Sequence, residues 1–186
     1  SVAVDNIAVS QALGVSKNVS HGSWFYNPLT NSWSYLMVGN AANTTNGLSV
    51  ASGGWYLTDS TGGNMAWCKF DANGNLVVGW HQENSGMYYS EADPTSPHYG
   101  EMCAGWKNIG GVDFYFGADG RLLVNGITPD GYIVNEFGMK VGLASTVFGL
   151  NQTENAVPVV DPTFMMVIQS FCQTQQMQAF NTTQVK

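Results

Sequence analysis

The dipeptides Gly54-Trp55, Gly79-Trp80 and Gly105-Trp106 recur along this sequence at steps of 25 and 26 residues, and Gly126-Ile127 follows 21 residues later. A fixed period of roughly 20 to 50 residues is typical of proteins built from stacked repeats. Each dipeptide therefore marks the same position in a repeated unit, and this repeat guides the interpretation of the rest of the chain.

The interiors of two units align as well. Residues 67–78 (WCKFDANGNLVV) match residues 113–124 (DFYFGADGRLLV), which places Asn73-Gly74 opposite Asp119-Gly120. Both dipeptides are strong signals for a type I′ hairpin turn, whose two central residues need a positive φ. Because an isolated hairpin is barely stable in water, successive hairpins must bury their aromatic faces against one another. The predicted fold is all-β, an array of short β-hairpin repeats that forms an elongated solenoid.

The repeats have less regular flanks. Residues 22–38 repeat the aromatic pattern loosely and predict an earlier, enlarged hairpin, whereas residues 1–20 are ambiguous between helix and strand. Residues 40–47 have the composition of a loop. The second unit carries an insertion at residues 91–100, where two prolines predict a protruding loop.

We predict three segments, namely residues 1–53 with a degenerate aromatic repeat, residues 54–141 with the hairpin repeats, and a C-terminal extension at residues 142–186. The extension is interpreted as a packing or oligomerisation segment. Asp161-Pro162 favours the start of a short helix within it, although the apolar residues that follow are equally compatible with a buried strand.

Composition excludes some classes of partner. Charged residues make up only 10% of the 186 residues, aromatic residues make up 12%, and the net charge is -7. An acidic chain without a basic patch repels nucleic acid. No apolar run approaches the roughly 20 residues of a membrane span, and the N-terminus lacks the pattern of a signal peptide. The low charge and the many rings favour a secreted or cell-surface protein whose signal peptide is absent from this chain.

The three cysteines form neither a disulfide framework nor a metal site, because none lies at metal-ligand spacing from another. They are Cys68, Cys103 and Cys172. Free buried thiols are favoured, although a Cys68–Cys103 disulfide between neighbouring units stays open. The three histidines are not spaced as metal ligands either, and they are interpreted as surface residues: His21, His81 and His98.

The acidic residues in and directly after the insertion are candidates for a hydrolase site, namely Glu91, Asp93 or Glu101. A pair of glycosidase carboxylates works when rigid elements hold the two groups about 5 to 10 Å apart. A proline-rich loop is a poor platform for such a pair. We therefore expect no enzymatic activity, no catalytic residue and no cofactor.

The repeat resembles that of the bacterial cell-wall-binding family, also called choline-binding repeats, and of its glucan-binding relatives. The usual unit of that family has Gly-Trp, a connection, an aromatic second strand and a glycine turn. Residues 105–116 match this unit closely, and residues 126–138 look like the closing repeat of such an array. The resemblance covers residues 54–140 well and residues 22–53 weakly.

The resemblance implies a cage between hairpins in which ring faces attract a quaternary ammonium by cation–π interaction. Carried over to this chain, the implied ligand-binding residues are Trp55, Trp67, Trp80, Met87, Tyr89, Trp106 and Tyr115. Trp67 is the one second-strand tryptophan that remains, since Met87 and Asp113 stand at the equivalent positions. Because these two residues provide no ring face, we expect choline to bind only at millimolar concentration or above, while sugar rings still stack.

The leading functional hypothesis is a non-catalytic module that anchors an exported bacterial protein to a cell-wall polymer or an extracellular glycan. Its predicted contact surface is a groove between the second and third hairpins, lined by Trp80, Tyr89, Trp106 and Tyr115, with Met87 in place of a ring. The alternative, from a different class, is a structural spacer or adhesin segment that forms homo-oligomers and whose repeats bind no ligand.

Overall fold

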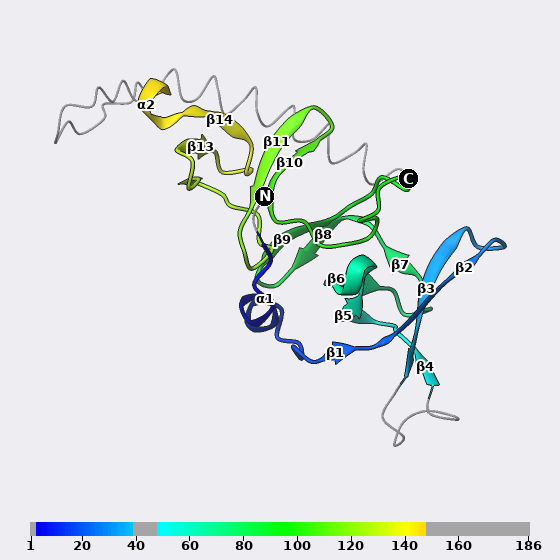
Figure 1. Cartoon of the computed structure of the whole chain (residues 1–186). Helices are drawn as coiled ribbons and strands as arrows, with labels where there is room; N and C mark the ends of the chain where they lie inside the picture. Colours follow the sequence, from blue (N-terminus) through cyan, green and yellow to red (C-terminus); the bar gives the residue numbers. More distant parts are fainter. Residues whose placement is uncertain (1–2, 39–47, 148–186) are drawn as a thin grey trace. The chain divides into compact units, whose positions relative to one another are not determined.

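The computed structural model describes residues 3–38 and 48–147. These residues form two compact units: the N-terminal unit, residues 5–103, and the C-terminal unit, whose described part is residues 104–147 together with residues 3 and 4. Strands and turns make up most of both units (Figure 1). The predictions made for residues 40–47 and for the segment after Asp161 fall outside the described residues.

The N-terminal unit begins with helix α1, Asn6–Leu13. Asp5 caps the helix, because its carboxylate accepts hydrogen bonds from the backbone N–H groups of Ile7 and Ala8. Gly14 ends it in the left-handed conformation, with φ at 68°. The ambiguous N-terminal segment is therefore a helix, followed by the two-residue strand β1, Val19–Ser20.

Three small sheets complete the N-terminal unit (Figure 1). In the first, β2 (Gly22–Asn27), β3 (Ser32–Val38) and β4 (Leu48–Val50) are antiparallel. In the second, β5 (Gly54–Asp59), β6 (Met65–Phe70) and β7 (Leu76–Val77) are antiparallel, and β1 runs parallel to β5. The third is the hairpin of β8 (Gly79–Glu83) and β9 (Gly86–Ser90). The enlarged hairpin predicted within residues 22–38 is confirmed as β2–β3.

The turns differ from the sequence prediction. Asn73-Gly74 lies between β6 and the short strand β7, while the longer β5–β6 pairing is closed by residues 60–64, which include a 3₁₀ turn at Thr61–Gly63. Gly74 has φ at 82°, but Asn73 is not in the positive-φ region, so the expected type I′ turn is wrong. The cause is Asp71, whose carboxylate accepts the N–H groups of Asn73 and Asn75 and stabilises a wider loop.

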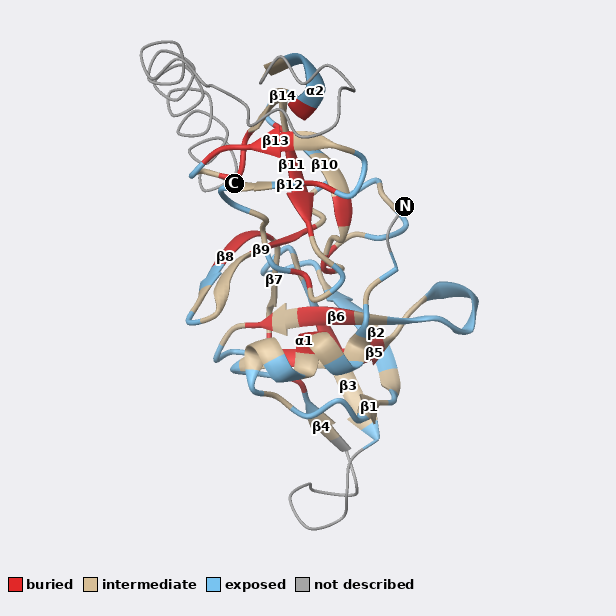
Figure 2. Cartoon of the chain, turned by 90° about the vertical axis from the view of Figure 1, so that its left-hand side faces the viewer, coloured by how far each residue is buried: buried red, intermediate tan, exposed pale blue. Residues whose placement is uncertain are grey.

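The core of the N-terminal unit is aromatic. Tyr35 and Phe70 are fully buried, and the ring of Trp24 lies 4.8 Å from the ring of Tyr35 and 5.6 Å from that of Phe70, centroid to centroid. Figure 2 shows the burial along β6. The Tyr35 hydroxyl donates to the Ser20 carbonyl at 2.6 Å and accepts from the Asp59 N–H at 3.0 Å. One side chain thus joins β3 to β1 and to the end of β5.

Cys68 belongs to this core and is a free thiol, as is the half-buried Cys103. Burial raises the pKa of Cys68 to about 12. The preference for free thiols over a Cys68–Cys103 disulfide is therefore confirmed, whereas Cys172 lies outside the described residues.

The C-terminal unit contains a hairpin and a second, three-stranded sheet. Its elements are β10 (Gly105–Ile109), β11 (Val112–Phe116), β12 (Gly126–Ile127), β13 (Tyr132–Val134), β14 (Lys140–Leu143) and helix α2 (Ala144–Val147). A bridge between Phe114 and Met139 links the hairpin to the sheet, and both side chains are buried. This bridge brings Lys140 next to the Gly-Trp hairpin.

The hairpin-built, mainly β architecture is confirmed in each unit, and every Gly-Trp dipeptide starts the first strand of a hairpin. The elongated solenoid stays a prediction. Within residues 3–38 and 48–147, no helix has the length and apolar character that a membrane span requires.

Candidate functional site

The first ring cluster surrounds Trp55 on β5. The Trp55 indole is only 7% exposed, and it packs edge-on against the His81 ring at 4.9 Å. The Lys69 ammonium lies 5.9 Å from the Trp55 ring centroid. Glu83 accepts hydrogen bonds from both the Trp55 indole N–H, at 3.1 Å, and the Lys69 ammonium. This cluster is a closed structural contact between β5, β6 and the β8–β9 hairpin.

The second ring cluster surrounds Trp106 on β10 and is half-buried. The rings of Tyr115 and Tyr132 meet Trp106 edge-on, at 5.3 and 5.7 Å. The ammonium of Lys140 lies 4.4 Å from the Tyr132 ring centroid and 5.4 Å from the Trp106 ring centroid. The Asp113 carboxylate lies 3.6 Å from the same ammonium. We call this arrangement of Trp106, Tyr132, Asp113 and Lys140 the Trp106 seat.

Asp130 fixes the Trp106 ring, because its carboxylate accepts the indole N–H at 2.8 Å. The pKa of Asp130 is below its ordinary value because the Thr128 hydroxyl and then the Trp106 indole donate hydrogen bonds to the carboxylate. The ring of Trp106 is therefore held in one orientation with its face toward Lys140.

The other residues of the predicted ligand set have varied surroundings. Trp67 is 2% exposed and donates its indole N–H to Asn6. Trp80 and Tyr89 are a cross-strand pair of the β8–β9 hairpin, with ring centroids 5.2 Å apart. Burial raises the pKa of Tyr89 to about 12.

Met87 is half-buried opposite Gln82. The predicted groove would join Trp80 and Tyr89 to Trp106 and Tyr115 in the other unit, and it stays a prediction.

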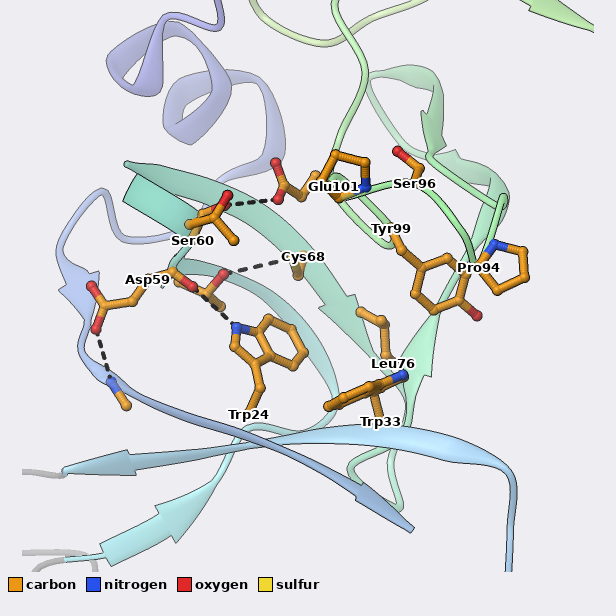
Figure 3. A pocket seen from close by; sticks show the side chains of 14 residues that line it. Trp24, Trp33, Asp59, Ser60, Cys68, Leu76, Pro94, Ser96, Tyr99 and Glu101 are labelled. Carbon is orange, nitrogen blue, oxygen red and sulfur yellow. Dashed lines mark hydrogen bonds between the residues drawn. The ribbon is translucent and has the colours of Figure 1, made fainter. Parts of the chain in front are cut away.

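A separate cavity of about 500 Å³ lies in the N-terminal unit. Figure 3 shows Trp24, Trp33, Leu76 and Tyr99 gathered around it, with Asp59, Ser60 and Glu101 on one side. Trp24 comes from β2, Trp33 from β3 and Asp59 from the end of β5, whereas Tyr99 comes from the insertion and Glu101 directly follows it. Residues separated by more than seventy positions therefore share one site.

The insertion does not simply protrude, which corrects the prediction from its prolines. Its base is closed by hydrogen bonds from the Glu91 N–H to the Glu101 carbonyl and from the Gly100 N–H to the Glu91 carbonyl. The Glu101 carboxylate then accepts the Ser60 hydroxyl at 2.8 Å, which ties the loop to the end of β5. Pro94 and Pro97 line the cavity. The prolines thus stiffen one wall of a pocket.

Asp59 also lines the cavity, but its carboxylate is turned away from Leu76 and Tyr99 (Figure 3). It accepts the Gly22 N–H at 3.1 Å and lies 2.9 Å from the His21 imidazole. Only glycine fits at position 22, because an added Cβ would lie 2.2 Å from the Leu36 carbonyl oxygen. The hydrogen bond from the Gly22 N–H is the main cause of the lowered pKa of Asp59, and the His21 imidazole lowers this pKa further. A general acid of a glycosidase needs a raised pKa, so Asp59 is unsuited to that role.

The three candidate hydrolase carboxylates are not gathered in the cavity. Glu101 lines it, but Glu91 accepts the Asp93 N–H, and Asp93 accepts the N–H and hydroxyl of Thr95. Glu91 and Asp93 therefore shape the loop. Among the described residues, no group of three potential metal ligands occurs.

His81 corrects the prediction that all histidines are on the surface. Its side chain is 4% exposed, lies 2.8 Å from the Ser90 hydroxyl and packs on Trp55. Burial lowers its pKa to about 4, and the nearby Lys69 ammonium adds to the effect. His21 and His98 are exposed, as predicted.

The sequence interpretation missed Lys140, Tyr132 and the cavity residues. The sequence places the rings at 24 and 33 in a degenerate hairpin, and it singles out the insertion for its prolines and its acidic residues but not for Tyr99. The useful signal was the combination of an aromatic, Tyr99, with an acidic residue, Glu101, in a loop of unusual length.

Neither a protein-family profile nor a curated protein matches the chain. Solved structures do. The choline-binding domain of a Streptococcus pneumoniae protein is 30% identical over 54% of this chain and 99% of that domain, with a TM-score of 0.38. The hairpin repeat is that of choline-binding proteins.

Two longer choline-binding proteins match as well. CbpJ from Streptococcus pneumoniae is 30% identical, with 64% of this chain and 41% of that chain covered and a TM-score of 0.35. CbpF, solved with ipratropium, is 28% identical, with 64% and 38% covered and a TM-score of 0.37. The present chain thus spans about two fifths of the length of these choline-binding proteins.

Proposed function

We propose that this chain is a non-catalytic module that attaches an exported bacterial protein to a polymer of the cell envelope. The observation that carries the proposal is the Trp106 seat, where two ring faces and one carboxylate surround an ammonium group. Ring faces attract cations because the π-system carries negative charge on its face. The seat is therefore chemically suited to the cationic groups of a polymer.

The occupant of the seat is Lys140, so an external ammonium must displace it. Each such contact is weak, but a polymer presents the same group many times along its length. Once one contact has formed, the next is effectively intramolecular, and the contacts together hold more strongly than any one alone. Weak affinity for a free ammonium ligand is thus compatible with firm retention on a cell wall.

Retention on purified bacterial cell walls tests the proposal. The unmodified chain should sediment with the walls, and Trp106→Ala should remain largely in the supernatant because the seat loses one face and the support of Asp130. Phe25→Ala is the matched control, since it removes an exposed ring of β2 that contacts no lysine in the described interactions. Equal retention of both variants, or no retention of the unmodified chain, would contradict the proposal.

A further inference from the structure

The cavity of the N-terminal unit has the size of a ligand site. Its volume of about 500 Å³ falls within the range of roughly 300 to 1,000 Å³ that is usual for small-molecule pockets. It contains none of the residues of the Trp106 seat. A ligand of this cavity would therefore bind independently of the proposed attachment to the envelope.

The walls of the cavity are aromatic. Trp33 is 38% exposed and its ring packs on Tyr26 at 5.3 Å, while Trp24 is anchored by its indole N–H, which donates to the Asp59 carbonyl at 3.0 Å. Tyr99 faces the same space from the insertion (Figure 3). Flat rings that are held in place suit a ligand with a C–H face, such as a sugar ring.

The polar side of the cavity has carboxylates and hydroxyls. Asp59 and Glu101 line it, and so do Ser60, Thr61 and Ser96, whereas no lysine, arginine or histidine is among the lining residues. The Asp59 carboxylate is engaged by Gly22 and His21, so Glu101 is the acidic group that the cavity presents to a ligand. The Glu101 carboxylate accepts the Ser60 hydroxyl and lies 3.1 Å from the exposed His98 imidazole. It disfavours an anionic ligand and favours a cationic one. It also accepts hydrogen bonds, which an ammonium with N–H groups supplies and a quaternary ammonium does not.

These features together define the class of ligand. A sugar ring would stack on the aromatic walls, its hydroxyls would pair with the serine and threonine hydroxyls, and an amino group would pair with the Glu101 carboxylate. We propose that this cavity binds a sugar unit that carries a free, protonated amino group. Glu101 is the specificity-determining residue, because it lines the cavity directly after the insertion and its carboxylate is the acidic group nearest to a bound ligand.

Calorimetric titration of the full chain with two matched disaccharides tests the proposal. One is the disaccharide of glucosamine and the other is its N-acetylated counterpart, both slightly below neutral pH, where the free amine is charged. The glucosamine disaccharide should bind roughly tenfold more tightly, since acetylation removes the charge that the Glu101 carboxylate attracts.

Variants assign the effect to the cavity. Glu101→Gln keeps the size of the side chain and an acceptor for Ser60, so it should remove the preference for the free amine while leaving the affinity for the acetylated sugar unchanged. Trp33→Ala should weaken the binding of both sugars. Trp106→Ala, in the other unit, should change neither, so failure of this proposal is distinguishable from failure of wall attachment.

Three results would overturn the proposal. The first is equal or undetectable binding of the two disaccharides. The second is a loss of affinity in Glu101→Gln that is the same for both disaccharides. The third is displacement of the bound sugar by excess choline. The last result would show that the cavity takes quaternary ammonium ligands.

Discussion

Trp55 and Trp106 stand at the same position of two hairpins, and each has a lysine ammonium near its ring. In the N-terminal unit, Glu83 accepts from both Trp55 and Lys69, and the ring is buried. In the C-terminal unit, Lys140 is held at 3.6 Å by an Asp113 carboxylate that is 42% exposed. The same repeat position is thus a closed core contact in one unit and a half-open seat in the other.

The largest expected effect is on stability. Trp55→Ala should lower the free energy of unfolding by about 3 to 5 kcal/mol, because a buried ring leaves a cavity. Trp106→Ala should cost about 1 to 2 kcal/mol, since its ring is half-exposed and loses less burial. Urea unfolding followed by circular dichroism measures both. Equal losses would break the distinction between a core ring and a seat.

The second effect is a dependence on pH between 6.5 and 4 that comes from His81, which packs on Trp55. The pKa of His81 is about 4 in the folded chain and 6.5 ordinarily, so the unfolded chain binds more protons between these values. Stability should be fully present above pH 6.5 and should fall as the pH drops toward 4, by up to about 3 kcal/mol.

Urea unfolding at several pH values checks this, and His81→Gln should flatten the curve between pH 6.5 and 4. His98→Gln is the control, because the His98 side chain is 67% exposed and its partner is the Glu101 carboxylate at 3.1 Å, so burial is what distinguishes His81 from it. If the two variants respond to pH alike, the burial of His81 is not the cause of the acid sensitivity.

The smallest effect concerns choline. The unmodified chain should bind it at millimolar concentration or above, because Lys140 fills the seat. Lys140→Ala should raise the affinity by roughly tenfold, since Asp113 and the two ring faces become available to the ligand. Calorimetric titration of choline measures the change.

Lys69→Ala serves as the comparison for that titration. It removes the equivalent lysine beside Trp55, but the ring there stays buried, so the affinity for choline should not change. A similar gain in both variants, or micromolar affinity in the unmodified chain, would refute the assignment of Lys140 as the occupant that limits binding.

The repeat could be predicted from the sequence because its signals are local. Gly-Trp dipeptides mark the first strands, and Asn73-Gly74 correctly indicated a turn. The type of turn could not be predicted from the dipeptide, because Asp71 competes for the backbone N–H groups two and four residues further on. Local side-chain hydrogen bonds of this kind override a dipeptide preference.

The candidate sites depend on contacts that a repeat pattern does not contain. Lys140 reaches Trp106 only because the Phe114–Met139 bridge sets β14 beside the hairpin. The cavity needs the end of β5 to meet an insertion some forty residues later, through Ser60 and Glu101. Met87 and Asp113 did signal a change at the ring positions, and Asp113 proves to be the partner of a lysine.

The closed base of the insertion has a consequence for how such a protein acquires a new specificity. Glu91 and Glu101 are joined through their backbones, and Gly100 completes the closure, so the ends of the loop are fixed independently of its tip. Residues 92–99 are then a replaceable part, and loops of other composition grafted there would present different side chains to the same tryptophans. A repetitive scaffold can in this way diversify at a single connection while every hairpin keeps its aromatic packing.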